Sequence, residues 1–320
     1  MQTPPADVPE SAVLEIVRDG WDAGATSAAY LPVGYGSHHW AVAGGGGRRW
    51  FVTADATPSD VEAARLEAAF GVPGAARAAG VSGAHGPVPS RDGALLRPLG
   101  RWSLSAQPWL DGAAGAFGDR WPTSVAEQVV RLLAGLHAVP QDAVPAQPED
   151  LALPGRADLE DALDRCARGE RLAGGPVAAA VADLLTRYGA VARAALAEHD
   201  VAPPPAPSAA VLTHGEPHPG NVVVTRSGPV LVDWDTARLA EPERDLWLVA
   251  ARTDLDVPAL YRELAGRELD RARMRWRERR WALADVAVYV PELVRAPRED
   301  EDTTWQLRAL RGTLEGLAGP

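Results

Sequence analysis

The sequence predicts an α+β protein with a small antiparallel sheet in its N-terminal part and a larger, mostly helical C-terminal part. Residues 28–56 contain three short runs of aromatic and β-branched residues, separated by the turn segments GYGS and GGGG. Beyond Gly112 the pattern changes to long helical segments, joined by proline-rich connectors that cannot propagate a helix. A hairpin pattern at 211–235 interrupts these helices. We therefore expect two parts, 1–108 and 109–320.

In the N-terminal part, the runs AAYLPV, HHWAVA and RRWFVTAD are expected to form three antiparallel strands. Residues 59–80 begin with Ser-Asp ahead of an alanine-rich stretch, which is typical of a helix start, and Pro73–Gly74 predicts a break in this helix. Strand character returns over residues 86–110, where SRDG is expected to form a turn between GPVP and ALLRPL.

In the C-terminal part, TSVAEQVVRLLAGLHAV has a Thr or Ser cap and apolar residues at three-to-four spacing, which predicts an amphipathic helix. Two further helices are expected over roughly 157–171 and 175–198. The runs VLTHG, NVVVT and PVLVDWD predict strands, with RSG as the hairpin turn between the last two. Helices are expected from about residue 243 to the end, and the charged segment 298–304 is expected to be a solvated loop.

The composition argues against several classes of protein. Hydrophobic residues make up 46% of the chain and charged residues 23%, as in an ordinary globular protein rather than a disordered one. The net charge of −11 comes from acidic residues spread along the chain, so we expect no nucleic-acid binding. Because neither an export signal nor a long apolar segment is visible, we expect a cytoplasmic protein that does not enter a membrane. The single cysteine, Cys166, lies in a helical pattern and is assigned no role.

Two short segments gather the residues that carry chemistry. The first, HGEPHPGN, follows a strand, and the second, VDWD, ends the strand that is expected to pair with NVVVT. Both segments should therefore open at the same edge of one hairpin, where oxygens of Glu216, Asn221, Asp233 and Asp235 would converge. Hard oxygen ligands at this density suit Mg²⁺, which proteins hold with one or two carboxylates plus substrate phosphates.

The pattern H-x-D/E-x-x-x-x-N followed by D-x-D resembles the catalytic loop and the metal loop of the protein-kinase-like fold. Gly215 in place of the kinase Arg, and D-x-D in place of D-F-G, are similar to the aminoglycoside phosphotransferase and choline kinase branch. The segment VDWDTARLAEPERDLW extends the resemblance, because Asp245 matches a further Asp that supports the catalytic loop. The resemblance covers about residues 25–320. It implies a two-lobed fold with a nucleotide-binding lobe over 1–108 and a catalytic and substrate-binding lobe with a helical subdomain over 109–320.

The resemblance also implies roles for the motif residues. Asn221 and Asp233 would hold Mg²⁺ on the nucleotide phosphates, with help from Asp235, and His214 would brace the catalytic loop. Glu216 stands where the family usually has the Asp that orients or accepts the proton of the attacking hydroxyl. Phosphoryl transfer depends mainly on positioning and charge neutralisation, so a longer carboxylate could serve as this base. The alternative is that Glu216 only caps the amides of the loop.

The N-terminal lobe would then supply the nucleotide site. The segment PVGYGSH between two strands contains Gly34 and Gly36, with Ser37 beside them, where backbone N–H groups could approach phosphates. The segment SAQPWLDG matches the hinge between the lobes, so groups at Gln107 and Trp109 would bind the adenine. Trp109 is equally consistent with plain core packing.

One departure from the family pattern concerns the lysine of the third strand, which grips the α- and β-phosphates and pairs with a helix glutamate. All 32 basic residues are arginines, and Thr53 stands at the matching position. Arg48 or Arg49 could reach in from the start of the strand, although arginine is a planar fork and not a point charge. The helix glutamates, Glu62 and Glu67, would lose their partner.

Two functions follow from these patterns. The first is a phosphotransferase that uses ATP (or GTP) and Mg²⁺ to modify a hydroxyl of a small molecule, which could be an aminoglycoside, another antibiotic or a metabolite, with a cationic acceptor as one option. The intact pair of Asn221 and Asp233 favours this reading. The alternative is a pseudokinase of the same fold that acts as a binding or regulatory partner of another protein, which Thr53 and Glu216 favour.

Overall fold

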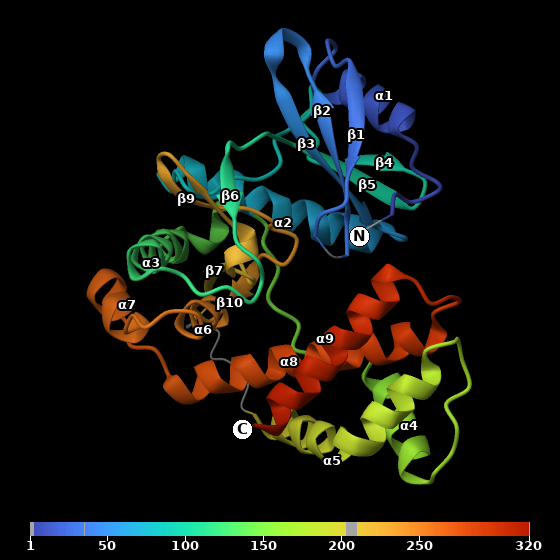
Figure 1. The fold of residues 1–320 in the computed structure, drawn as a ribbon. Helices are drawn as coiled ribbons and strands as arrows, with labels where there is room; N and C mark the ends of the chain where they lie inside the picture. Colours follow the sequence, from blue (N-terminus) through green and yellow to red (C-terminus); the bar gives the residue numbers. More distant parts are fainter. Residues whose placement is uncertain (1–2, 35, 203–209, 320) are drawn as a thin grey trace. The chain divides into compact units, whose positions relative to one another are not determined.

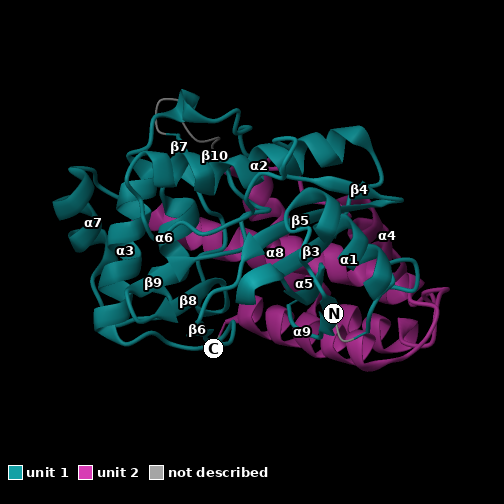
Figure 2. Ribbon diagram, turned by 90° about the horizontal axis from the view of Figure 1, so that it is seen from above, with its two compact units in different colours: residues 1–149, 205–269 teal, residues 150–204, 270–320 magenta. Residues whose placement is uncertain are grey.

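The computed structural model describes residues 3–34, 36–202 and 210–319. Packing groups the chain into two compact units, coloured separately in Figure 2: unit 1 comprises 1–149 and 205–269, and unit 2 comprises 150–204 and 270–320. The boundary expected after residue 108 lies inside unit 1, at the end of a strand. The proline-rich connector expected at 200–210 lies mostly outside the described residues.

The N-terminal part of unit 1 is an antiparallel five-stranded sheet in the order β1-β2-β3-β5-β4 (Figure 1). Its strands are β1 (Ser27–Leu31), β2 (His38–Ala43), β3 (Arg49–Ala56), β4 (Arg97–Leu99) and β5 (Trp102–Pro108). The first three are the strands expected from the sequence, and the GGGG turn closes the β2–β3 hairpin as a short 3-10 helix, Gly45–Gly47. Residues 86–90 form no strand, although the turn at 90–93 is present.

The two faces of this sheet differ in chemistry. One face buries Trp40, Val52 and Leu104 against the helix α1 (Glu10–Gly20), which the sequence did not predict. Side chains alternate across a strand, so the residues between these, including Thr53, lie on the opposite face. That face carries polar groups, and it is the face on which the candidate site is built.

Helix α2 (Asp60–Ala78) begins as expected, with Ser59 accepting a hydrogen bond from the Glu62 N–H at 3.3 Å. The predicted break at Pro73–Gly74 was wrong, because the helix continues through the proline. A proline inside a helix removes one backbone hydrogen bond. Burial of Val72 and Ala76 on either side of the proline compensates for that loss.

The remainder of unit 1 holds the hairpin and its supporting helices. Strands β8 (Val222–Thr225) and β9 (Gly228–Leu231) form the expected hairpin, which β6 (Gly112–Ala114) extends at one edge. Strand β7 (Val211–Thr213) pairs with a short strand that was not expected, β10 (Arg238–Ala240). The helices are α3 (Thr123–His137), α6 (Glu243–Ala250) and α7 (Val257–Ala265), and α3 contacts both of the others.

The described residues of unit 2 form helices joined by loops, without strands. Its helices are α4 (Arg156–Ala167), α5 (Ala178–Val201), α8 (Arg271–Arg295) and α9 (Glu301–Ala318), and they share one apolar core. The expectation of a loop over 298–304 was wrong in its second half, because α9 begins at Glu301. Asp300 caps this helix by accepting from the Thr303 N–H at 3.0 Å, while the Thr303 hydroxyl accepts from the Asp300 N–H.

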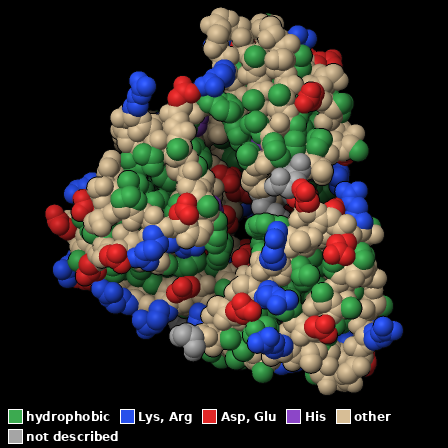
Figure 3. All heavy atoms as spheres, viewed as in Figure 1, with side chains coloured by type: hydrophobic (Ala, Val, Ile, Leu, Met, Phe, Trp, Pro, Cys, Tyr) green, Lys and Arg blue, Asp and Glu red, His purple; other side chains and the backbone are tan. Residues whose placement is uncertain are grey.

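The surface carries both acidic and basic side chains. Figure 3 shows arginine side chains interspersed with acidic ones, without a continuous basic area among the described residues of the face in view. None of the described helices is long and apolar enough to cross a membrane.

Candidate active site

The catalytic-loop segment 213–221 is anchored on one fully buried carboxylate, Asp245 of α6. Asp245 Oδ2 accepts from the His214 N–H at 2.9 Å and faces His137 Nε2 at 3.1 Å, while Oδ1 accepts from the Gly215 N–H at 2.6 Å. Burial by itself would raise the pKa of Asp245, but the hydrogen bond with His137 and the charge of Arg244 hold it below its usual value. The carboxylate is therefore ionised and fixes the backbone at the start of the loop.

The imidazole of His214 is held in one tautomer. Its Nε2 lies 2.8 Å from the Val232 carbonyl oxygen, which can only accept, and its Nδ1 lies 3.3 Å from the Glu216 N–H, which can only donate. The ring therefore carries its proton on Nε2. Burial lowers the pKa of His214 to about 4, so the ring is neutral at physiological pH. It connects the loop to the segment that precedes Asp233.

Gly215 leaves room for an arginine from elsewhere in the chain. It has a φ of +105°, and a Cβ there would collide with the guanidinium of Arg244 and lie 2.6 Å from Thr236 Oγ1. Arg244 donates to Glu149 Oε1 at 3.2 Å, to Thr213 Oγ1 at 2.8 Å and to the Thr236 carbonyl at 2.8 Å. A guanidinium thus packs against Gly215, the sequence position that holds an arginine in the H-R-D motif of protein kinases.

Glu216 and Asn221 belong to one hydrogen-bonded turn. Asn221 Nδ2 donates to the Glu216 carbonyl oxygen at 3.1 Å, which leaves Asn221 Oδ1 as the side-chain atom able to bind a cation. His218 Nδ1 accepts from the Gly220 N–H at 3.1 Å, and burial lowers the pKa of His218 to about 3. The turn ends in the 3-10 helix Pro219–Asn221, so the prolines and glycine of HGEPHPGN set the path that brings the Asn221 side chain to the Glu216 carbonyl.

Asp233 has a φ of +66° and is the single non-glycine residue with positive φ among those described. Such a conformation costs free energy and persists where the surrounding structure imposes it. The Val232 N–H donates to the Asn221 carbonyl at 3.0 Å, so the end of β9 delivers Asp233 beside the catalytic turn. The charges of Asp235 and Glu216 act on Asp233, so these carboxylates lie close together at the end of the hairpin.

A buried carboxylate that the sequence analysis did not single out, Asp55 of β3, joins this group. Its Oδ1 accepts from the Ser37 hydroxyl at 2.5 Å, and no hydrogen-bond partner for its buried Oδ2 is found in the described part of the chain. Burial raises the pKa of Asp55 to about 7, with a further contribution from Asp235. Burial raises the pKa of Asp233 well above its usual value as well, and the charges of Asp235, Glu216 and Asp55 add to this effect.

These acidic groups suit a divalent cation. Their mutual repulsion raises the pKa of Asp233, and carboxylate and amide oxygens are the ligands that Mg²⁺ prefers. Within the described ranges, no three His, Cys, Asp or Glu side chains are spaced to hold a metal by themselves. A Mg²⁺ ion on Asn221 and Asp233 would complete its coordination with phosphate oxygens and water, as is usual for this ion.

The segment around Gly34 and Gly36, which we call the glycine turn, precedes Ser37, the partner of Asp55. Gly34 and Gly36 both have positive φ, 71° and 86°, which suits a turn that presents backbone N–H groups to an anion. Ser37, at the end of this turn, is tied to Asp55 as described above. Of the three predicted residues, Ser37 is the one whose side chain is bonded to Asp55, and the charge of Asp55 acts in turn on Asp233.

Neither arginine at the start of β3 replaces the missing lysine. Arg48 donates twice to Asp22, at 3.0 and 2.9 Å, and Arg49 pairs with Asp111 and lies over the Trp109 ring at 4.8 Å. The helix glutamates also have other partners, because Glu62 accepts from the Ser59 hydroxyl at 2.7 Å and Glu67 from the Leu95 N–H at 3.4 Å. Thr53, at the lysine position, faces His39 instead.

The expected hinge is partly engaged with protein groups. Gln107 pairs with Phe51 in the sheet, the Trp109 N–H donates to the Arg49 carbonyl at 3.0 Å, and His85 Nε2 lies 2.8 Å from the Pro108 carbonyl. Among the described residues, the Leu110 N–H has no acceptor. The hinge can therefore offer an adenine the Leu110 N–H more readily than groups of Gln107 or Trp109.

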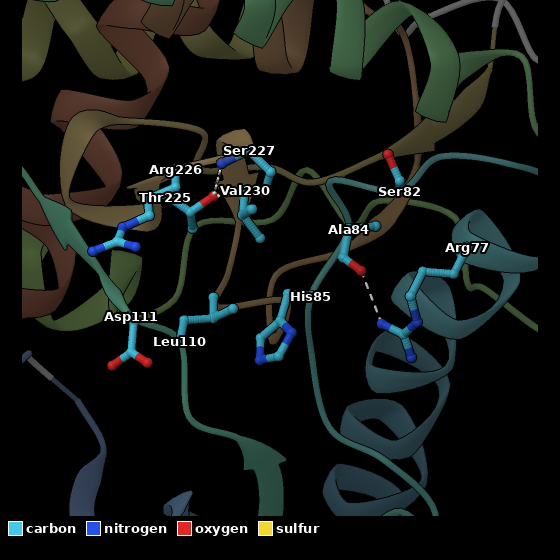
Figure 4. Close-up of a pocket in the computed structure, with 10 residues that line it drawn as sticks. All are labelled: Arg77, Ser82, Ala84, His85, Leu110, Asp111, Thr225, Arg226, Ser227 and Val230. Carbon is cyan, nitrogen blue, oxygen red and sulfur yellow. Dashed lines mark hydrogen bonds between the residues drawn. The ribbon is translucent and has the colours of Figure 1, made fainter.

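A separate pocket with a volume of about 660 Å³ lies next to the hinge (Figure 4). Its wall includes Arg77, His85, Leu110 and Arg226, together with other residues of the β8–β9 turn. Arg77 Nη1 donates to the Ala84 carbonyl at 2.8 Å. None of the lining residues is a site residue predicted from the sequence.

Three residues of the site were missed from the sequence. His137 and Arg244 lie far along the chain from the loop they support, and their only signals were the His that ends the LLAGLH helix and the Arg directly before Asp245. Asp55 sits two residues beyond Thr53, on the same face of β3, so strand alternation could have identified it.

The chain is similar to several characterised proteins. Protein StrN of Streptomyces griseus is 29% identical over 233 residues, which cover 69% of this chain and 68% of StrN. Solved structures with the same fold include spectinomycin phosphotransferase in complex with ADP and spectinomycin, with a TM-score of 0.74, 14% identity and 98% coverage of both chains. An amicoumacin kinase in complex with AMP-PNP and Ca²⁺ has a TM-score of 0.60 and 14% identity, and covers 98% of this chain and 95% of its own.

A macrolide 2′-phosphotransferase from Brachybacterium faecium also aligns, with a TM-score of 0.54, 19% identity and 99% coverage of both chains. These likenesses confirm the predicted α+β, protein-kinase-like fold. The model of the phosphotransferase enzyme family matches residues 28–278, which is more than half of the chain. The protein therefore belongs to the phosphotransferase enzyme family.

Proposed function

We propose that the protein transfers the terminal phosphoryl group of ATP, with Mg²⁺, to a hydroxyl group of a small molecule. The observation that carries this proposal is the catalytic turn, in which Asn221 binds the Glu216 carbonyl and lies beside Asp233 at the end of the hairpin. The strained φ of Asp233 supports it further, because residues held in such conformations cluster at functional sites.

The residues divide the work as follows. Asn221 Oδ1 and Asp233 would hold Mg²⁺, with Asp235 in support, and the bound ion would supply positive charge to the phosphates. The acceptor oxygen forms a bond to the γ-phosphorus while the bond from that phosphorus to the β–γ bridging oxygen breaks, so ADP leaves. The carboxylate of Glu216 takes the proton of the acceptor hydroxyl. His214 and Asp245 act through the loop backbone that they hold in place.

The nucleotide would lie between the glycine turn and the hinge. Backbone N–H groups at Gly34 and Gly36 bind phosphate oxygens, and the Leu110 N–H binds the base. The hinge carbonyl of Pro108 is already occupied by His85, so the base is recognised through few backbone groups. Both ATP and GTP are candidates for this reason.

The acceptor class is proposed from the relatives. Spectinomycin, amicoumacin and macrolides appear in the names of proteins with this fold, and each offers hydroxyl groups. The net charge of −11 favours a cationic acceptor such as an amino-sugar compound, because opposite charge raises the rate of encounter. We propose a cytoplasmic location for this reaction, where ATP is available.

A second candidate is a pseudokinase that binds a partner protein and transfers no phosphate. Two residues favour it. Thr53 supplies no positive charge at the lysine position, and the carboxylate of Asp55 nearby would repel phosphates when it is ionised. Glu216 in place of the usual Asp points in the same direction.

Phosphotransfer from Mg²⁺–ATP to a panel containing spectinomycin, aminoglycosides and macrolides decides between the two. We expect phosphorylated product with the wild type, a loss of about 100-fold or more with Asp233→Asn, and a large loss with Glu216→Gln. The surface variant Asp254→Asn serves as the control, because its carboxylate is exposed and forms an ion pair with Arg120. ATP binding without product from any acceptor would favour the pseudokinase, and no nucleotide binding at all would refute the phosphotransferase.

A further inference from the structure

The position left by the missing lysine is occupied by a pair of side chains, His39 and Thr53. They lie directly opposite each other on β2 and β3, and His39 Nδ1 is 3.1 Å from Thr53 Oγ1. The imidazole packs against the Phe51 ring, with centroids 4.9 Å apart. The pair therefore lies on the face of the sheet opposite α1, which also carries Ser37 and Asp55.

The other nitrogen of this ring points toward the glycine turn. A Cβ placed on Gly34 would lie 3.0 Å from His39 Nε2, so the nitrogen sits directly against Gly34. No partner for Nε2 exists among the described residues, whereas Nδ1 is fixed by Thr53. The ring thus offers one engaged and one available nitrogen.

The pair lies midway between the two ends of the nucleotide site. Along one face of β3, Phe51 pairs with Gln107 near the hinge, Thr53 follows, and Asp55 adjoins the metal residues. Successive residues on one face of a strand are about 7 Å apart. A nucleotide whose base is at the hinge and whose terminal phosphates are at the metal residues would place its α- and β-phosphates beside Thr53 and His39.

We propose that His39 donates a hydrogen bond from Nε2 to an α- or β-phosphate oxygen and that Thr53 is the positioning residue that orients it, so that the pair replaces the lysine of the third strand. This inference rests on the proposed use of a nucleotide. A phosphate oxygen only accepts, so Nε2 must carry the proton, and Thr53 must donate its hydroxyl proton to Nδ1. A valine at position 53 could not select this tautomer, whereas a serine could.

The ring acts as a neutral donor in the free protein. Burial lowers the pKa of His39 to about 4, so it carries no charge at physiological pH. A neutral donor avoids the cost of keeping a buried cation without a partner before the nucleotide arrives. It also binds phosphate less strongly than a lysine would, which leaves more of the charge neutralisation to the metal ion.

Calorimetric titration with Mg²⁺–ATP and, separately, with adenosine tests the inference. We expect His39→Leu to weaken ATP binding about tenfold or more, because a hydrogen bond to a charged group is lost, and to leave adenosine binding within about twofold. Thr53→Val should weaken ATP binding by a smaller factor, and Thr53→Ser should restore it. Thr26→Val, which removes a hydroxyl from the edge of the same sheet, is the matched control and should change neither affinity.

Imidazole ¹⁵N spectra give a second readout that a purely structural role would not change. We expect the His39 ring, identified by its absence from the His39→Leu spectrum, to be protonated at Nε2, and we expect ATP but not adenosine to shift that nitrogen. If the wild type binds ATP and His39→Leu binds it equally well, or loses ATP and adenosine affinity alike, the inference falls while the proposed function stands. If the wild type binds no ATP, both fall. Should His39→Leu fail to fold, Thr53→Val and Thr53→Ser carry the test.

Discussion

Replacing Asp245 with asparagine tests the brace beneath the catalytic loop. The side chain is fully buried and receives hydrogen bonds from three donors: the N–H groups of His214 and Gly215 and the Nε2 of His137. Asparagine has the same shape but presents an NH₂ group in place of one oxygen. In the less damaging orientation the NH₂ group faces Gly215, so that one buried N–H loses its acceptor while the other two bonds lose their charge.

The magnitude follows from these bonds. Leaving one buried N–H unsatisfied costs about 1–3 kcal/mol, and weakening two charge-assisted bonds adds to that, so we expect Asp245→Asn to lower the free energy of unfolding by about 3 kcal/mol. The lowered pKa of Asp245 supports a loss of stability in this variant, because the folded protein stabilises the ionised carboxylate despite its burial.

Urea unfolding followed by tryptophan fluorescence is the measurement, because Trp234 and Trp247 lie in unit 1 near the loop. Asp254→Asn is the control. Its carboxylate is 93% exposed in an ion pair with Arg120, so a change below about 0.5 kcal/mol is expected. Equal unfolding midpoints for the two variants would show that the hydrogen bonds to Asp245 do not carry the stability assigned to them.

Three further predictions concern stability. Gly215→Ala should lower the free energy of unfolding by about 2 kcal/mol or more, because its φ is positive and its Cβ would displace Arg244; an unchanged midpoint would contradict this. Asp233→Asn should raise the thermal midpoint in Mg²⁺-free buffer by relieving repulsion from Asp235, and a lower midpoint would count against the cluster. Burial raises the pKa of Asp285 in α8 to about 7, so the ionised carboxylate destabilises the folded state. This destabilisation is absent below the ordinary pKa near 4, grows between pH 4 and 7 and persists above pH 7. Asp285→Asn should therefore stabilise the protein at pH 8, by at most about 4 kcal/mol, and have little effect at pH 4; equal effects at the two pH values would contradict this.

Elements that depend on short-range sequence patterns were predicted with few errors. The strands of residues 27–56 and the β8–β9 hairpin depend on nearby turn residues and on alternation, which a sequence displays directly. Errors arose where packing at a distance outweighed local preference. Burial around Pro73 kept α2 continuous, and α1 is defined by its contact with the sheet rather than by a strong start signal.

The candidate site divides in the same way. Glu216, Asn221, Asp233 and Asp235 could be grouped from the sequence because one hairpin connects them and its register follows from the turn. His137 and Asp245 are 108 residues apart and meet only because α3 and α6 pack together. No spacing rule reports such a contact.

The amino-acid sequence by itself determined that a lysine is absent, that a glutamate stands at position 216 and that Asn221, Asp233 and Asp235 lie on one hairpin. These are properties of composition and local spacing. Only the tertiary structure decided what fills the space of the lysine: Arg48 and Arg49 bind elsewhere, while His39 meets Thr53 across two strands. The physical reason is that a side chain's role depends on which face of the sheet it occupies and which partner it meets there, and both are set by the packing of strands against α1.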